Sequence, residues 1–226
     1  MLTRNLNLIG MGNPCNSSHA GSVLILIINN KAAKSTIVIP ALTASGVLPP
    51  FISGYPDGGP VSTAPYEATM LEVATRFCTS PERAKLFKGL LLLRSELVAI
   101  GVNTGVQWLD GSFCEDVEST RGRPPGDIDV VTLLVRPQAV QDDDSWKKFW
   151  QTNTRVFNSP STKAVFGCEA FYIDAGYPAL LVAEQVTSWF GLFTHQRVSH
   201  LWKGIVQVPL VSDDTDAGKF VDTLRF

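Results

Sequence analysis

Two apolar runs joined by a polar connector, together residues 106–136, constrain the fold of this chain more than any other feature. The first run ends in the Asp-Gly-Ser string at 110–112, and an Asp-Gly pair favours a tight turn because glycine tolerates backbone angles that other residues resist. The second run, residues 127–135, begins with Asp127 and Asp129 and continues with aliphatic and β-branched residues. This pattern predicts two strands, with a turn closing the first and a carboxylate pair opening the second.

The two aspartates of the second predicted strand share one face, because strand side chains alternate and Ile128 and Val130 then face the core. Their Cα atoms are separated by roughly 6.6 Å, which lets both carboxylates approach one cation. Like charges on one face repel each other, and a hard divalent cation removes that repulsion. We therefore predict that Asp127 and Asp129 bind Mg²⁺, or Mn²⁺ in its place; two solvated aspartates at a strand end are the alternative.

Gly111 and Ser112 are expected to form a phosphate-binding turn beside these carboxylates. Glycine allows close backbone approach, and Ser112 is predicted to cap a short helix over 113–118, whose first backbone N–H groups would bind phosphate. Residues 115–118 include three acids, Glu115, Asp116 and Glu118, which are expected to lie in a solvated first turn.

The string Trp-Leu-Asp-Gly-Ser-Phe at 108–113, followed by Pro-Gly-Asp-Ile-Asp-Val-Val at 125–131, resembles the nucleotidyltransferase superfamily of the DNA polymerase β type. It is similar in particular to a small, largely uncharacterised bacterial family of nucleotidyltransferase-like proteins, over approximately residues 40–210. The resemblance implies an α/β or α+β domain of nucleotidyltransferase fold, with a small mixed sheet and helices mainly on one face. The spacer of 14 residues between Ser112 and Asp127 is slightly long for the superfamily.

The resemblance also implies a third carboxylate on a later strand, and two residues compete for that position. Glu169 lies early in a strand predicted over 168–173, whereas Asp174 precedes an Ala-Gly-Tyr-Pro turn. We predict that Glu169 completes the set, as general base or as cation ligand, and Asp174 remains the alternative. Arg197 and Lys203, in strings that resemble the family's C-terminal half, are candidates for binding a triphosphate, with placement on the surface as the alternative.

Turn residues and apolar periodicity predict the rest of the fold. The Pro/Gly-rich segment 39–66 cannot be helical and is expected to wrap over the domain, anchored by Leu48, Phe51 and Tyr55. Helices are expected over residues 65–77, 80–100, 142–150 and 179–193, and after residues 213–216.

Composition narrows the class of function. The formal net charge is −2 over 226 residues, so no global basic field recruits nucleic acid. His195 and His200 lie five positions apart, off the helical i,i+4 face, and predict no histidine metal site. The four cysteines contain no CxxC pair, and they predict reduced thiols, as in a cytoplasmic protein.

Residues 1–36 differ from the rest of the chain, which we assign to one nucleotidyltransferase-like domain over 37–226. Asn, Ser, Gly and Lys dominate this extension, and its run of six apolar residues at 23–28 is too short to span a bilayer, which needs ~20 residues. A disordered or loosely packed extension, an added edge strand and an export signal remain open, as does a start codon placed too early.

The expected function is Mg²⁺-dependent transfer of a nucleoside monophosphate from a nucleoside triphosphate to a hydroxyl of an RNA end, a protein or a small molecule, as the resemblance implies. The alternative is a non-catalytic component of a toxin–antitoxin or phage-defence module that binds a nucleotide or a partner protein. An RNA-binding protein is a third possibility, and it would need a contiguous surface of Arg and Lys. No membrane association is expected.

Overall fold

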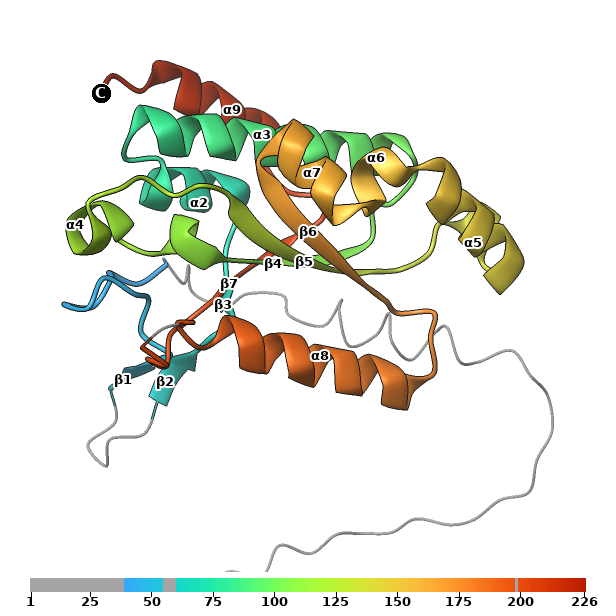
Figure 1. Cartoon of the computed structure of the whole chain (residues 1–226), viewed down its shortest axis with the longest axis horizontal. Coiled ribbons are helices and arrows are strands. Elements are labelled where there is room, and N and C mark those ends of the chain that lie inside the picture. The colour runs from blue at the N-terminus through green and yellow to red at the C-terminus, as the bar shows by residue number, and fades with distance from the viewer. Residues whose placement is uncertain (1–38, 55–59, 198) are drawn as a thin grey trace, which may run out of the picture. The chain divides into compact units, whose positions relative to one another are not determined.

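The computed structural model describes residues 39–54, 60–197 and 199–226, which form an α+β fold (Figure 1). This confirms the expected class, whereas the extension predicted over 1–36 and the anchor predicted at Tyr55 lie outside the described residues. The central element is a five-stranded mixed sheet in the order β3 (Tyr66–Glu67), β7 (Val206–Pro209), β4 (Gly105–Asp110), β5 (Ile128–Leu134) and β6 (Cys168–Asp174).

Strand pairing in this sheet places the polar strand ends next to each other. The strands β4 and β5 are antiparallel, so Asp110, the last residue of β4, lies opposite Asp129 near the start of β5. The strands β5 and β6 are parallel, so Asp129 in turn lies opposite Glu169 near the start of β6. Three carboxylates from three adjacent strands therefore meet at one end of the sheet.

Helices cover the two faces of the sheet unequally, as Figure 1 shows. Val130 and Leu134 belong to the large core on one face, while Val131 and Ile173 belong to a small cluster on the other. This confirms the prediction of helices mainly on one face. The large core is covered by α2 (Met70–Phe77), α3 (Pro81–Ala99), α6 (Thr154–Phe157), α7 (Ser159–Phe166) and α9 (Asp214–Thr223), and the small cluster by α8 (Ala179–Phe193).

The segment before these helices is not helical in its described part, as predicted from its proline and glycine content. Leu48 is a buried anchor, and Phe51 is half-buried. Phe51 begins a separate two-stranded hairpin of β1 (Phe51–Ser53) and β2 (Pro60–Thr63).

The helix predicted over 65–77 begins later than expected. It starts at Met70, because Thr69 and Glu72 form a capping box, and residues 66–67 are the strand β3 instead. The next helix, α3, begins at the predicted Ser80 cap and ends at Ala99. The remaining described helical elements are η1 (Gly111–Cys114), α4 (Val117–Arg121), η2 (Gln138–Val140) and α5 (Asp143–Thr152).

None of the helices in the described ranges combines the length and the apolar character that crossing a bilayer requires.

Candidate functional site

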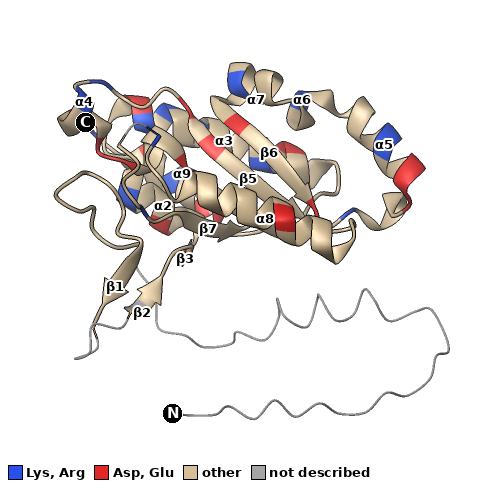
Figure 2. Cartoon of the chain, turned by 60° about the horizontal axis from the view of Figure 1, so that its bottom comes forward, with Lys and Arg blue, Asp and Glu red and all other residues tan. Residues whose placement is uncertain are grey.

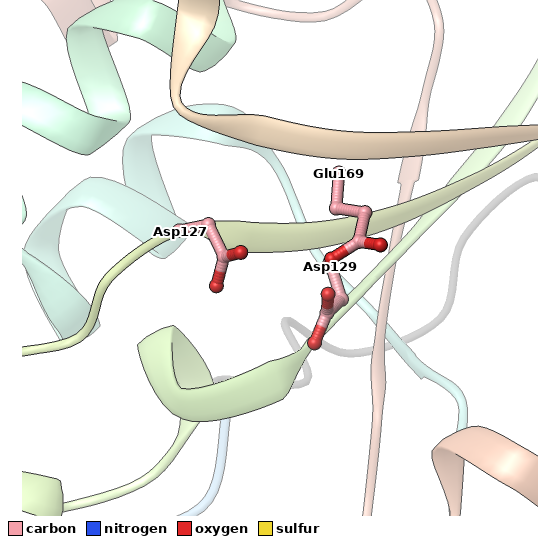
Figure 3. Close-up of side chains that lie close together, drawn as sticks. All are labelled: Asp127, Asp129 and Glu169. Atoms are coloured by element: carbon pink, nitrogen blue, oxygen red, sulfur yellow. The ribbon is translucent and has the colours of Figure 1, made fainter. Parts of the chain in front are cut away.

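An acidic triad of Asp127, Asp129 and Glu169 forms where β5 and β6 begin (Figure 3). One carboxylate oxygen from each residue lies within 4.8 Å of the other two. The triad follows from strand geometry, because Ile128 and Val130 are fully buried and direct the alternate side chains to the opposite side. The structure therefore brings together the two aspartates that the sequence pattern placed on one face.

Glu169, not Asp174, joins the aspartate pair. In the parallel register Glu169 lies opposite Asp129, whereas Asp174 lies opposite Leu134 at the other end of β6. The Asp174 carboxylate accepts a hydrogen bond from the Arg136 guanidinium at 2.8 Å. The expected placement of Glu169 beside the pair is thus what the structure has, while its chemical role stays a prediction.

The surroundings of Asp129 favour the protonated form of its carboxyl group. Burial, and to a smaller extent the neighbouring charges of Asp127 and Glu169, together raise the pKa of Asp129 to about 6. Figure 2 shows the acidic segments of β5 and β6 side by side. A group of carboxylates held this close favours any cation that can neutralise it.

One such cation is Lys163 of α7, which the sequence analysis did not single out. Its ammonium lies 2.6 Å from Asp127 Oδ2 and 2.9 Å from Glu169 Oε2. Hydrogen bonds to these two carboxylates raise the pKa of Lys163, so the ammonium stays charged. The contact arises because α7 ends at Phe166, Gly167 follows in a left-handed conformation, and the chain turns directly into β6.

Gly111 lies against the triad from the neighbouring strand. It follows β4 with φ of +77°, and a Cβ atom at this position would lie 2.2 Å from Asp129 Oδ2. Only glycine therefore fits between the turn and the carboxylate, which explains the Asp-Gly pair in the sequence. Ser112 follows in η1 and is half-buried.

The helix expected over 113–118 is replaced by two shorter elements. η1 spans Gly111–Cys114, and α4 begins only at Val117, where Asp116 accepts a hydrogen bond from the Ser119 backbone N–H. Ser112 is therefore not the cap of that helix. Asp116 is a better cap acceptor there because its carboxylate reaches the backbone N–H three residues ahead.

Arg83 of α3 holds the backbone of this turn from the core side. Its guanidinium donates to the Phe113 carbonyl at 2.6 Å and to the Glu118 carboxylate at 2.6 Å. The Arg83 side chain is only 4 % exposed, whereas the Glu118 side chain is 37 % exposed. Glu118 therefore serves as a partner of Arg83 rather than as one of three solvated acids.

Lys203 has a different position from the one expected of a triphosphate-binding lysine. Its ammonium lies 2.8 Å from Asp110 Oδ1 and 2.9 Å from Glu115 Oε1, and its side chain is 3 % exposed. We call Lys203, Asp110 and Glu115 the buried lysine cluster. The expectation that Glu115 lies in a solvated turn is wrong, because Glu115 also accepts hydrogen bonds from Arg121 and Gln196 and is 5 % exposed.

Burial dominates the electrostatics of this cluster. It raises the pKa of Asp110 to about 7, although the Lys203 ammonium opposes the shift. Asp110 immediately precedes Gly111 and lies opposite Asp129 in the sheet. The buried lysine cluster therefore fixes the strand end from which the Gly111 turn starts.

Arg197 is exposed, and its positive charge lowers the pKa of Asp129 against the stronger effect of burial. Of the four residues predicted to bind a nucleotide, Gly111 and Ser112 lie in the turn beside the triad, Arg197 acts on the triad through its charge, and Lys203 is enclosed in the buried lysine cluster. Their nucleotide-binding roles stay predictions.

The donor set of the triad fits a hard divalent cation. All three residues offer carboxylate oxygens, which Mg²⁺ and Mn²⁺ prefer, and no histidine or thiol joins the group within the described ranges. Asp127, Asp129 and Glu169 are each half-buried, so the group is open to solvent on one side.

A family model described as a family of unknown function (DUF6932) matches residues 40–209. No curated protein and no solved structure matches the chain. The matched range contains the complete acidic triad, the Gly111 turn and the buried lysine cluster.

Proposed function

Because the chain belongs to the DUF6932 family, whose function is unknown, we propose an activity from its site: it transfers a nucleoside monophosphate from a nucleoside triphosphate to a hydroxyl group. One observation carries this proposal. Three carboxylates where two parallel strands begin converge within 4.8 Å beside a turn in which only a glycine fits.

The triad would hold Mg²⁺ or Mn²⁺ through Asp127, Asp129 and Glu169. When bound, such a cation orients the triphosphate and offsets the negative charge that develops on it. The carboxylates suit this role because their mutual repulsion, which raises the pKa of Asp129 in addition to burial, is relieved by a bound cation.

The other residues of the site bind and orient the nucleotide. Gly111 lets the turn pack directly against the triad, since a Cβ atom at this position would lie 2.2 Å from Asp129 Oδ2. The Ser112 hydroxyl donates to a phosphate oxygen, and the exposed Arg197 guanidinium contributes positive charge toward the same region. This arrangement favours a highly anionic ligand such as a triphosphate.

The reaction breaks one phosphoanhydride bond and forms one phosphoester bond. The oxygen of the acceptor hydroxyl attacks the α-phosphorus, pyrophosphate leaves with the electrons of the broken P–O bond, and the hydroxyl proton passes to the Glu169 carboxylate. We assign the proton to Glu169 because it comes from a separate strand beside the aspartate pair. The acceptor is an RNA end, a protein side chain or a small molecule.

The proposed compartment is the cytoplasm, where nucleoside triphosphates are available. The free thiols Cys78, Cys114 and Cys168 are in keeping with a reducing compartment.

The test is a transfer assay with each of the four α-labelled triphosphates, Mg²⁺ and cell extract as the source of acceptors. We expect the wild type to release pyrophosphate and to label an acceptor, and Asp127→Asn and Asp129→Asn to lower the rate by roughly 10³-fold, as the loss of a charged group at the reacting centre does. Asp144→Asn is the matched control, because Asp144 is an exposed aspartate of α5 away from the triad.

Two results would contradict the proposal. The first is equal rates in the wild type and both triad variants. The second is nucleotide binding without pyrophosphate release in the wild type, which would support a non-catalytic nucleotide-binding or partner-binding component instead.

A further inference from the structure

We propose that Lys163 is an internal competitor for the cation site, which occupies the acidic triad in the cation-free protein and must be displaced before a divalent cation binds. This inference rests on the cation site of the proposed function. It assigns to Lys163 a role that determines the affinity and selectivity of that site.

The ammonium of Lys163 uses the same oxygen atoms that a cation would need. It contacts Asp127 Oδ2 at 2.6 Å and Glu169 Oε2 at 2.9 Å, which is the spacing of direct ion pairs. A divalent cation coordinated by both residues would lie between these two carboxylates. Two positive charges cannot share that space, so binding of the cation requires the ammonium to move away.

The Lys163 side chain is able to leave, while its backbone is held in place. The side chain is 52 % exposed, and within the described part of the chain its ammonium pairs with the two triad carboxylates. The preceding residue, Thr162, is fully buried, and its hydroxyl oxygen accepts a hydrogen bond from the Ala170 backbone N–H of β6. The ammonium can therefore swing into water without disturbing α7 or β6.

Close packing of α7 against α3 fixes the position of the Lys163 backbone. A Cβ atom at Gly89 of α3 would lie 2.0 Å from the Phe166 carbonyl oxygen of α7, so the two helices approach more closely than any other residue at position 89 would allow. Lys163 lies one turn before Phe166 on α7, so this rigidly packed helix positions the lysine side chain at the triad.

Competition by a tethered ammonium selects for divalent cations. The effective concentration of a covalently attached charge is high, so a free monovalent ion such as K⁺ does not displace it. A divalent ion interacts about twice as strongly with the same carboxylates at the same distance and can displace it. Lys163 also limits the repulsion between Asp127 and Glu169 while no cation is bound.

The first experiment measures Mn²⁺ binding without nucleotide, by electron paramagnetic resonance of free Mn²⁺ in the full-length protein. We expect Lys163→Met to bind Mn²⁺ about tenfold more tightly than the wild type, since two partly exposed ion pairs no longer have to be broken. Lys163→Arg keeps the competing charge and should stay close to the wild type. Lys147→Met, which removes an exposed lysine of α5, is the control for net charge.

The second experiment observes the displacement itself. Lysine acylation by a limiting amine-reactive reagent is read out residue by residue by mass spectrometry, with and without Mn²⁺. Release from the triad should increase the acylation of Lys163 several-fold in the presence of Mn²⁺, while that of Lys147 stays unchanged.

The outcomes separate this inference from the proposed function. Equal or weaker Mn²⁺ binding by Lys163→Met overturns the competition, even if the wild type transfers nucleotides. Tighter binding by that variant together with Mn²⁺-dependent acylation supports the competition, even if no transfer is detected. If neither the wild type nor Lys163→Met binds Mn²⁺, both the competition and the cation site are wrong.

Discussion

Two lysines of this protein each bridge two carboxylates, and they differ in almost everything else. Lys163 contacts Asp127 and Glu169 with a side chain that is 52 % exposed. Lys203 contacts Asp110 and Glu115 with a side chain that is 3 % exposed. The distances are nearly the same, so the difference between the two sites lies in their access to water.

Access to water decides what each ion pair can do. Exposed pairs contribute little because water and salt compete with them, so they can be exchanged for other ions at little cost. Buried pairs are held in place, because removing one partner leaves an unpaired charge away from water. The comparison therefore predicts that another cation can replace Lys163 at the triad, whereas the buried lysine cluster holds the end of β4 in place.

The largest effect is expected when the buried lysine cluster loses its cation. Lys203→Met leaves Glu115 and Asp110 buried without their ammonium, and breaking a buried pair in this way costs about 3–5 kcal/mol. We expect a loss of that size in the free energy of unfolding, measured by urea titration at pH 8, where Asp110 is ionised. Lys147→Met is the control, and a loss below about 1 kcal/mol would place Lys203 in the same class as Lys163.

The next effect is a pH dependence that belongs to the buried lysine cluster. Burial raises the pKa of Asp110 to about 7 from its ordinary value of 3.8. Between these values the folded state holds a proton that the unfolded state has lost, so this contribution is complete below pH 3.8 and is lost as the pH rises through 7. We expect the free energy of unfolding to fall by on the order of 4 kcal/mol across this window because of Asp110.

Asp110→Asn tests that assignment, because asparagine does not titrate. The fall in stability between about pH 4 and pH 7 should become smaller in this variant when urea unfolding is repeated across the range. Asp129 titrates in the same direction, with a pKa raised to about 6 by burial and by its acidic neighbours, and it accounts for part of the slope that remains. An unchanged slope in Asp110→Asn would assign the whole pH dependence to other groups.

The same comparison shows what the sequence could and could not predict. The pair Asp127 and Asp129 was predictable because strand alternation acts over neighbouring residues. Glu169 was expected beside them because the resemblance implies a third carboxylate on a later strand, and Glu169 lies early in one. The helix at 179–193 was predictable from its apolar composition and its proline start. Such features depend on local patterns, and the sequence displays them directly.

The buried lysine cluster could not be predicted because its partners are far apart in the chain. Lys203 and Asp110 are separated by 93 residues, and no local periodicity links them. Arg94 was missed for the same reason, since it lies within the apolar stripe of α3 but pairs with Asp214, 120 residues away. Sequence patterns marked Glu115 as solvated because acids at a helix start usually are, and the tertiary contact with Lys203 overrides that tendency.

Lys163 was missed although its partners are near in sequence. It lies only six residues before Glu169, yet the contact depends on the chain turning at Gly167, directly after α7, into a strand parallel to β5. A lysine in the last turn of a helix is ordinarily explained by the helix dipole, so the local pattern pointed to a solvated residue. Glycine after the last helical residue was the available signal for the turn.

The smallest effect on stability is expected from replacing Lys163, and it tests the comparison between the two lysines most directly. Lys163→Met removes two partly exposed ion pairs, so the free energy of unfolding should fall by less than about 1 kcal/mol, in contrast to Lys203→Met. A bound cation should also restore the stability that Lys163→Met loses. A cation that binds only the folded state stabilises it, and the effect grows with its affinity.

Urea unfolding of Lys163→Met with and without Mg²⁺ measures both parts of this prediction. At a fixed Mg²⁺ concentration the stabilisation should be larger in Lys163→Met than in the wild type, since the cation no longer competes with an ammonium in the variant. Mg²⁺ should not restore Lys203→Met, because the carboxylates of the buried lysine cluster are 5 % exposed and closed to a hydrated ion. If Mg²⁺ stabilised both lysine variants equally, exposure would not be what separates the two sites.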